Sequence, residues 1–534
     1  MTDLHPDGHY LEGAAVSTAC HTIDVGEGGS NDVRGQKKRD DGGQLYFAHR
    51  LIERTTSTVL RPDVLHGTSH SSASSASSLS SSSSSSSAAF VNTTIGGRYG
   101  APNTICDSPM GLIDATFEWI DRNIVDSVDF VVWTGDNARH DSDNTYPRSQ
   151  KEINTLNKII ATKVLDTFPP DLLGRRIPII PSIGNNDVYP HNILQPGPNP
   201  ILQNLAKIWT EFIPEAMTKT FARGGYFSVE AVADKITVFS LNTLYFFASN
   251  VAVDGCKAEE QPGTEQMDWL EVELKILRER KMVAYLTGHV PPDKKSYSPT
   301  CYARYTKIAL AFQDVIVGHL YGHANVDHFF LLSRGAGKES GEDEGVSPEI
   351  PVMDNSTLVE EKPDVKTNES RAMSLAAYLV DLWTQYDSVH SRAQLKDYAI
   401  VMVSPSVIPT YNPSLRVFSY QLDNHNDDDT QDDYEDDYNS RRHHRRGPGP
   451  VSTTTFGFPQ EYTQYWCNLT HANKHPSQTL TYEIEYRTRE DYGLENLGVS
   501  EMLGLARRIR RDEDLKKVYL DRMVVQTGSI TDAE

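Results

Sequence analysis

The sequence has no run of about 18 apolar residues, the length that a helix needs to cross a membrane. It also has no signal peptide, which would combine a basic start with a short apolar segment. Its five cysteines form no Cys-x-x-Cys pair, so the spacing argues against a zinc ribbon. We therefore expect neither a membrane-spanning helix nor a zinc ribbon in these 534 residues.

Core-forming residues are also scarce, since only 38% of the chain is hydrophobic. The deficit falls in three segments, 66–90, 335–372 and 423–453, and the first includes unbroken serine from Ser80 to Ser87. Such segments cannot bury enough apolar surface to offset the entropy lost on ordering, so we expect them to be disordered. This predicts one main domain over 1–422 with two inserts, a linker at 423–453, and an extension at 454–534 that packs on the main domain.

The chain is acidic overall, with a formal net charge of −22. Residues 338–369 hold ten acidic residues against three lysines, and residues 423–446 hold nine against four arginines, so more than half of the excess lies in the expected loops. Solubility is the simplest explanation of these runs, and nothing in the composition favours nucleic acid as a partner. The basic cluster Arg441–Arg446 could touch an anionic polymer, but a disordered or protease-sensitive loop is the preferred interpretation.

Four sequons for N-linked glycosylation indicate a secretory route, at Asn92, Asn355, Asn368 and Asn468. An oxidising compartment permits disulfides. On that route we expect the pairs Cys20–Cys106 and Cys256–Cys301, which leave Cys467 free.

Hydrophobic periodicity predicts alternating strands and helices. The expected helices span 109–126, 149–166, 200–213, 264–280 and 500–518, and the expected strands span 128–133, 177–181, 225–230, 235–242, 282–286, 315–317, 326–332, 398–403, 415–422 and 480–486. Ligands of open α/β sheets collect outside the carboxyl ends of strands, so polar motifs at those ends predict a site.

Five such polar motifs follow one another along the chain. They are Asp3-Leu4-His5, Gly135-Asp136 with His140, Gly184-Asn185-Asn186-Asp187, Gly288-His289, and Gly322-His323-Ala324-Asn325. Each alone is more often a turn, a helix cap or a surface loop. Together they supply the carboxylate, imidazole and amide ligands of a site that binds two divalent cations and cleaves phosphoesters.

In this hypothesis Asp136 bridges the two cations, and hydroxide formed between them attacks phosphorus. Asp3 and His5 alternate on an extended backbone, so their side chains face one side, while Asn185, His289 and His323 complete the set.

The residues around Asp136 predict further roles. His140 is the candidate general acid, because a helical turn after Asp136 would place both in one pocket. Arg139, Arg148 and His191 are candidates for holding the phosphates of a substrate.

Only Met1 and Thr2 precede Asp3, although a buried strand is expected to lead into this ligand. We therefore expect that this sequence begins too late, and that a missing upstream segment could hold a membrane anchor.

The motif series resembles that of the calcineurin-like metallophosphoesterase superfamily. The residues in and around the motifs are also similar to those of fungal endopolyphosphatases. The stretches that carry the second resemblance are Thr2–Asp7, Cys106–Pro109, Gly135–Asp141, Gly184–Asn192, Tyr321–Phe329 and Pro405–Phe418. The resemblance covers nearly the whole chain apart from the low-complexity inserts. It implies an α/β fold in which a β-sandwich of two mixed sheets is flanked by helices, with 1–422 as the catalytic domain.

The resemblance also implies how the two cations are held. One would be bound by Asp3, His5, Asp136 and Asn325, and the other by Asp136, Asn185, His289 and His323. The superfamily has histidine where this chain has Asn186 and Asn325. In the second change a nitrogen ligand becomes an oxygen or is lost, which would either weaken binding of the first cation or favour Mn²⁺ or Mg²⁺ over Zn²⁺. The sequence does not separate these ions from Co or Fe.

The function implied by the resemblance is hydrolysis of internal phosphoanhydride bonds in inorganic polyphosphate. The resemblance further implies a glycoprotein of the vacuole lumen or vacuole membrane. Two alternatives stay open: an acid sphingomyelinase-like phosphodiesterase on the same scaffold, and a metal-binding scaffold without catalysis. The asparagines at 186 and 325 argue against the first alternative.

Overall fold

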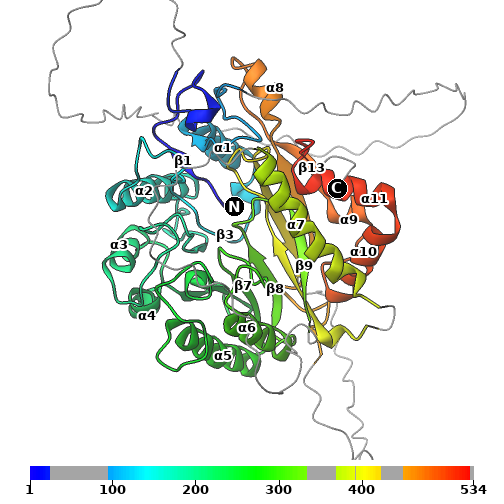
Figure 1. Cartoon of the computed structure of the whole chain (residues 1–534). Helices are drawn as coiled ribbons and strands as arrows, with labels where there is room; N and C mark the ends of the chain where they lie inside the picture. The colour runs from blue at the N-terminus through cyan, green and yellow to red at the C-terminus, as the bar shows by residue number, and fades with distance from the viewer. Residues whose placement is uncertain (24–93, 334–367, 391–392, 423–448, 530–534) are drawn as a thin grey trace, which may run out of the picture. The chain divides into compact units, whose positions relative to one another are not determined.

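The computed structural model describes residues 1–23, 94–333, 368–390, 393–422 and 449–529 (Figure 1). The expected insert at 66–90 lies outside the described residues, as do most of 335–372, most of 423–453 and the sequons at Asn92 and Asn355. The insert boundary at 372 is wrong, because a helix already begins at Asn368. No helix among the described residues is long and apolar enough to cross a membrane.

The central element is a six-stranded mixed sheet with the order β5-β6-β7-β8-β10-β9. Its strands are β5 (Phe227–Val232), β6 (Ile236–Ser240), β7 (Val283–Thr287), β8 (Ile316–Tyr321), β9 (His328–Ser333) and β10 (Tyr398–Val403). The inner pairs β6-β7, β7-β8 and β8-β10 are parallel, whereas β5 and β9 pair antiparallel at the two edges. The inner strands β6 and β7 are buried at every position, as expected for parallel strands covered on both faces.

Shorter sheets complete the β-structure. They are the parallel pair β1 (Pro6–Asp7) and β2 (Ser108–Pro109), the parallel pair β3 (Val131–Trp133) and β4 (Ile179–Pro181), and the antiparallel sheet of β11 (Ser414–Tyr420), β12 (Pro459–Trp466) and β13 (Glu483–Arg487). Ser240 on β6 donates a hydrogen bond to the carbonyl of Pro181 on β4 at 2.6 Å, so the β3-β4 layer is tied to the central sheet.

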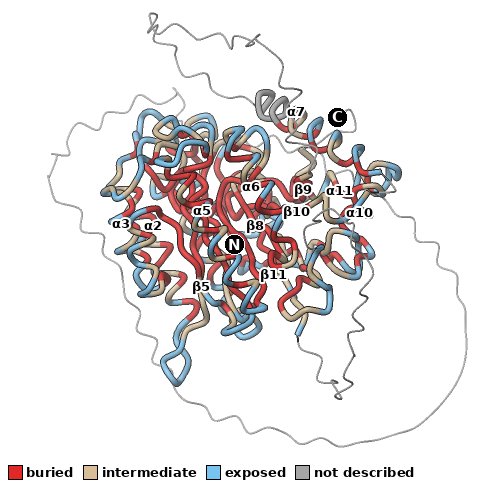
Figure 2. Tube along the Cα trace, turned by 90° about the horizontal axis from the view of Figure 1, so that it is seen from below, coloured by how far each residue is buried: buried red, intermediate tan, exposed pale blue. Residues whose placement is uncertain are grey.

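Eleven helices surround these sheets in the described part of the chain. They are α1 (Met110–Asn123), α2 (Gln150–Thr167), α3 (Pro200–Ile208), α4 (Thr218–Gly224), α5 (Pro262–Arg280), α6 (Pro299–Ala311), α7 (Asn368–Asp387), α8 (Leu469–Lys474), α9 (Thr488–Tyr492), α10 (Val499–Arg511) and α11 (Glu513–Met523). Several begin where the sequence places a start signal: Ser149 caps α2, Asn199 caps α3, and proline opens α3, α5 and α6. Buried positions gather on the strands and on the inner helix faces, while exposed positions lie on the outer faces (Figure 2).

The predicted fold class, mixed sheets flanked by helices, is confirmed. Most predicted elements are present with ends shifted by a few residues, but the single helix expected at 500–518 is wrong. Asp512 has an extended backbone there and caps α11 through its side chain, so two helices form. The helices α9, α10 and α11 lie together beside β13 (Figure 1).

Both predicted disulfides are confirmed, and Cys467 is free and buried. The Cys20–Cys106 bridge anchors the first described segment, and His21 adds a second attachment beside it. Its Nε2 lies 2.8 Å from Asp7 and its Nδ1 lies 2.8 Å from Asp143. Burial acts against a charge on this imidazole, but the two carboxylates outweigh burial and raise the pKa of His21.

This arrangement predicts that His21 stabilises the fold in a pH-dependent way. A pKa raised on folding gives stability that is complete below about pH 6.5, the unfolded value, and is lost as the pH rises through the folded value. His21→Gln is expected to lower the free energy of unfolding by about 1–3 kcal/mol at pH 5, because it removes a charged hydrogen-bond partner. Urea titrations across pH 5–9 are expected to show this difference shrinking as the pH rises.

The exposed His475 supplies the control, because His475→Gln removes an imidazole that has no carboxylate partner among the described contacts. A His21→Gln difference that stayed constant with pH, or that fell with pH to the same extent as the His475→Gln difference, would contradict a charged His21.

Candidate metal centre

The first described residues run along the end of β3. Thr134 N donates to Met1 O, Asp3 N donates to Gly135 O, and His5 N donates to Asp136 O, each at 3.1 Å. Asp3 and His5 are thereby placed against Asp136, although 131 residues separate His5 from Asp136 in the sequence. All three residues are buried.

Five of the seven predicted metal ligands meet in two groups that share one carboxylate. Asp3, His5 and Asp136 have ligand atoms within 4.8 Å of one another, and so do Asp136, His289 and His323. His5 Nε2 lies 3.3 Å, and His289 Nε2 3.2 Å, from the same oxygen of Asp136.

Asn185 belongs to the second group through its amide oxygen. This oxygen lies 2.8 Å from His289 Nε2 and 2.9 Å from His323 Nδ1. The amide nitrogen of Asn185 points the other way and donates to His191 Nε2 and Asn192 Oδ1, both at 2.9 Å. His191 and Asn192 therefore orient the amide so that its oxygen faces His289 and His323.

The extended backbone expected at Asp3 and His5 is wrong, because the backbone is left-handed at these and at other predicted ligands. Five of the seven predicted ligands have left-handed φ values, namely Asp3 (48°), His5 (38°), Asp136 (57°), His323 (71°) and Asn325 (58°). Such conformations each cost of order 1–3 kcal/mol in non-glycine residues, and they concentrate at functional sites. Because five of them cluster here, we infer that the left-handed backbone lowers the stability of the fold but points these side chains toward one another.

Glycines allow the turns that carry Asp136 and Asn185 to approach each other. A Cβ on Gly184 would lie 2.1 Å from Asp136 Oδ1, and a Cβ on Gly135 would lie 2.6 Å from Gly184 N. Gly135 also has a left-handed φ of 92°, which glycine adopts without strain. A side chain at either position would clash with the neighbouring turn, which explains why glycine precedes Asp136 and Asn185.

The residues fit two divalent cations. Asp3 Oδ1, His5 Nε2 and Asn325 Oδ1 are buried and have no hydrogen-bond partner, which is rare for buried polar atoms without an ion. His5 Nδ1 is bound to Ala138 O at 2.9 Å and His289 Nδ1 to Thr134 O at 2.8 Å, so each ring turns its Nε2 inward, as metal-ligating histidines do.

Electrostatics in the cluster couples the Asp136 carboxylate to the imidazoles around it. Burial acts to raise the pKa of Asp136, but the imidazoles of His289 and His5 outweigh it and hold this pKa well below its usual range. Burial opposes a charge on His289, yet Asp136 raises the pKa of this imidazole to about 9. Burial, together with the charge of His289, lowers the pKa of His323 to about 4.

The helical turn expected between Asp136 and His140 does not form. His140 nevertheless lies at the edge of the cluster, and its side chain is 31% exposed. Its ring stacks on that of His5 with the centroids 4.1 Å apart. Asp107 accepts from the backbone N of His140 at 2.6 Å and lies 2.7 Å from Nδ1. Burial acts to raise the pKa of Asp107, but His140 and its hydrogen bonds hold it below its ordinary value.

The two predicted phosphate-binding arginines are corrected by the structure. Arg139 is 1% exposed, and its guanidinium is bound to Glu152 and to the carbonyls of His140 and Tyr146. Arg148 is also buried, and it donates to the carbonyl of Arg139 and to Asn186 Oδ1. Neither guanidinium is free to hold a phosphate.

The other predicted residues have distinct positions. His191 is partly exposed, and its Nε2 contacts the amide nitrogen of the predicted ligand Asn185, so it orients that amide. Asn186 points toward Asp136. Its backbone N and its amide nitrogen both donate to that carboxylate, at 2.8 and 2.9 Å. The exposed Asn468 caps α8, and the side chain of Asn368 lies outside the described residues.

The motifs of the sequence predict no role for Asp107 or Asp187. Asp187 is fully buried and accepts from the backbone N of Asp136 (3.0 Å), Asn137 (2.7 Å) and Gly184 (2.9 Å). It also accepts from the side chains of Asn137 and Asn157. Burial and then the charge of Asp136 raise the pKa of Asp187 to about 6, against the opposing effect of the N–H donors.

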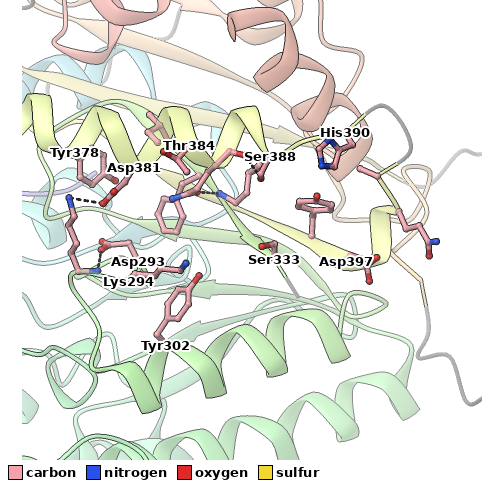
Figure 3. A pocket seen from close by; sticks show the side chains of 18 residues that line it. Asp293, Lys294, Tyr302, Ser333, Tyr378, Asp381, Thr384, Ser388, His390 and Asp397 are labelled. Atoms are coloured by element: carbon pink, nitrogen blue, oxygen red, sulfur yellow. Dashed lines mark hydrogen bonds and ion pairs between the residues drawn. The ribbon is translucent and has the colours of Figure 1, made fainter. Parts of the chain in front are cut away.

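A wide cavity of about 870 Å³ lies elsewhere, between α7, β9 and the loop after β7 (Figure 3). Its lining includes Asp293, Asp381 and Asp397 against Lys294 and Lys295, and it includes none of the predicted metal ligands. A polyanion would meet more carboxylates than lysines there. The metal cluster therefore remains the candidate site.

The Asp187 contacts predict that this carboxylate holds together the turns that carry Asp136 and Asn185. Asp187→Asn puts an NH₂ group against N–H donors, so we expect the free energy of unfolding to fall by about 2–4 kcal/mol. Binding of Mn²⁺ is expected to weaken as well. Urea denaturation and calorimetric Mn²⁺ titration measure the two effects.

Asp171 provides a matched control, because it accepts from the backbone N of Leu173 and Arg175 in an exposed turn. Asp171→Asn is expected to cost less than about 1 kcal/mol, as most surface substitutions do. Equal losses for the two variants would show that Asp187 has no special role.

Comparisons with known proteins agree with this geometry. The profile of the calcineurin-like phosphoesterase family matches residues 107–326. Proteins named endopolyphosphatase are similar to the chain: one from Cryptococcus neoformans is 38% identical over 80% of this chain and 58% of its own length, and one from Neurospora crassa is 41% identical over 61% and 47%. One from Candida glabrata is 30% identical over 81% of each chain. The chain thus spans about half the length of the first two relatives.

Proposed function

Because the chain belongs to the endopolyphosphatase family and carries a calcineurin-like phosphoesterase domain, we propose that it hydrolyses internal phosphoanhydride bonds of inorganic polyphosphate. The observation that carries the proposal is the pair of ligand groups that share Asp136, with the His140–Asp107 pair at their edge.

Two divalent cations would be held by Asp3, His5, Asp136 and Asn325 on one side and by Asp136, Asn185, His289 and His323 on the other. When bound, such cations acidify a water molecule and neutralise the charge of phosphoryl oxygens. The oxygen-rich ligand set, with Asn185 and Asn325, supports Mn²⁺ or Mg²⁺ as the physiological ions.

His140 would supply the proton that the leaving phosphate chain needs. Its Nδ1 faces Asp107, so its Nε2 is the atom left to hold a proton toward the substrate. Its partial exposure lets a long chain reach it, and the stacking on His5 keeps the ring beside the cluster. A positioned general acid of this kind contributes typically ~10²–10⁴ in rate.

The proposal includes a secretory route, glycosylation and a vacuolar location. Two disulfides support an oxidising compartment. The exposed sequon at Asn468 supports glycosylation there, because only its side-chain oxygen is engaged in capping α8.

The test incubates the protein with long-chain polyphosphate and Mn²⁺ and separates the products on a gel. The proposal predicts a progressive shift to shorter chains, since internal cleavage passes through intermediates. Activity is expected to disappear on treatment with a chelator and to return when Mn²⁺ is added back. His140→Ala is expected to lower the rate by about 10²–10⁴ while the protein still binds Mn²⁺.

Release of orthophosphate without shortened intermediates would contradict internal cleavage. Hydrolysis of a phosphodiester such as bis(4-nitrophenyl) phosphate, with polyphosphate left intact, would favour the sphingomyelinase-like alternative. Tight binding of two metals with neither activity would favour the non-catalytic scaffold.

A further inference from the structure

Two of the predicted ligands lie on a six-residue connection between β8 and β9. We call residues Gly322–Asp327 the metal loop, because they include His323 and Asn325. At its start the loop leaves a sheet strand, and Tyr321 O accepts a hydrogen bond from Ser404 N at 2.9 Å. Within the loop, His323 N donates to Asp3 Oδ2 at 3.1 Å and Ala324 N donates to Gly322 O at 2.8 Å.

The end of the metal loop is held through Asp327, which is only 4% exposed. Its Oδ1 accepts from Arg416 Nη2 and its Oδ2 accepts from the hydroxyl of Tyr486, both at 2.5 Å. Its backbone N donates to the carbonyl of Met523 at 2.9 Å. These three partners come from β11, β13 and α11, far along the chain from the loop.

The groups around Asp327 are themselves fixed. Arg416 donates through Nε to Gln464 on β12 at 2.9 Å, and its guanidinium lies 3.9 Å from the ring centroid of Tyr462. The hydroxyl of Tyr462 lies 3.0 Å from that of Tyr486. A buried carboxylate with a charged partner and a hydroxyl partner has a well-defined position, because loss of either partner leaves it poorly solvated.

All three partners of Asp327 lie outside residues 107–326, the stretch that the phosphoesterase profile covers. Asp327 is the first residue beyond that stretch. The carboxyl-terminal region thus contacts the metal loop two residues after the ligand Asn325, whose φ is +58°. Left-handed conformations of this kind persist only where the surrounding structure enforces them.

We propose that Asp327, Arg416 and Tyr486 form a clamp through which the carboxyl-terminal region positions the metal loop and sets the affinity of the site for one divalent cation. The inference rests on the proposed metal site. The clamp residues touch neither substrate nor cation, so they are positioning residues. They act by holding Asn325 where its unpartnered Oδ1 faces into the protein. Of the two cations, the one assigned to Asp3, His5, Asp136 and Asn325 is the one that the clamp controls.

Tyr486→Phe tests the clamp with the smallest change, because it removes the hydroxyl that binds Asp327 and leaves the ring in place. Tyr386→Phe is the matched control. Tyr386 is equally buried, and its hydroxyl also has two partners, Phe329 O at 2.8 Å and the hydroxyl of Tyr519 at 3.0 Å. Those partners lie outside the metal loop.

Calorimetric titration of the metal-free full chain with Mn²⁺, followed in parallel by electron paramagnetic resonance, measures the two affinities separately from activity. We expect Tyr486→Phe to weaken one of the two Mn²⁺ affinities by about 10–100-fold, as the loss of groups that orient ligands does. The other affinity is expected to stay close to that of the wild type. Tyr386→Phe is expected to lower the melting temperature to a similar extent and to leave both affinities unchanged.

Unchanged Mn²⁺ affinities in Tyr486→Phe would overturn the clamp, and so would equal weakening in Tyr386→Phe. Arg416→Lys is the second variant if Tyr486→Phe does not fold, because lysine keeps the charge but cannot bind Gln464 and Asp327 together; the same loss at one Mn²⁺ site is expected. Failure of the proposed function is distinguishable, since a wild-type protein that binds two Mn²⁺ without cleaving polyphosphate leaves the clamp testable.

Discussion

The carboxylate of Asp136 is the interaction on which the site depends. It lies buried where the segment Met1–His5, the end of β3, and the turn that carries Asn185 and Asn186 come together. A buried carboxylate is costly unless charged or hydrogen-bonding groups compensate it. Here the compensation comes from His5, His289 and Asn186, which approach it from separate parts of the chain. The need to satisfy one charge therefore brings the ligands together.

Contacts from residues that lie behind the predicted ligands stabilise their strained backbone. Asp187 binds the backbone of the turns on both sides of Asp136, and Gly135 and Gly184 allow those turns to approach each other. Asp327 does the same for the metal loop from the other end of the chain. The left-handed backbone at the predicted ligands is held in place by the hydrogen bonds that neighbouring residues make to the same turns. The strained backbone at the predicted ligands lowers the stability of the fold, and the buried hydrogen bonds of Asp187 and Asp327 offset this loss.

Much of this could be read from the sequence, because four of the five predicted ligand motifs follow a strand, and strand ends share one edge of a sheet. The periodicity placed both ends of β7 and β10 to within one residue. The failures concern long-range contacts. Arg139 and Arg148 resembled phosphate ligands, but Glu152 and buried carbonyls bind them inside. No local pattern distinguishes the role of Asp107 or Asp327 from that of a surface aspartate, since their partners are set by tertiary packing.

The most direct test of the account is to locate the bound ions themselves. Crystals of the protein soaked in Mn²⁺ and measured near the manganese absorption edge would show each ion as an anomalous peak. If Asp136 bridges two cations, the map will show two peaks about 3.5–4 Å apart with the Asp136 carboxylate between them. A single peak, or two peaks of which only one contacts Asp136, would contradict it.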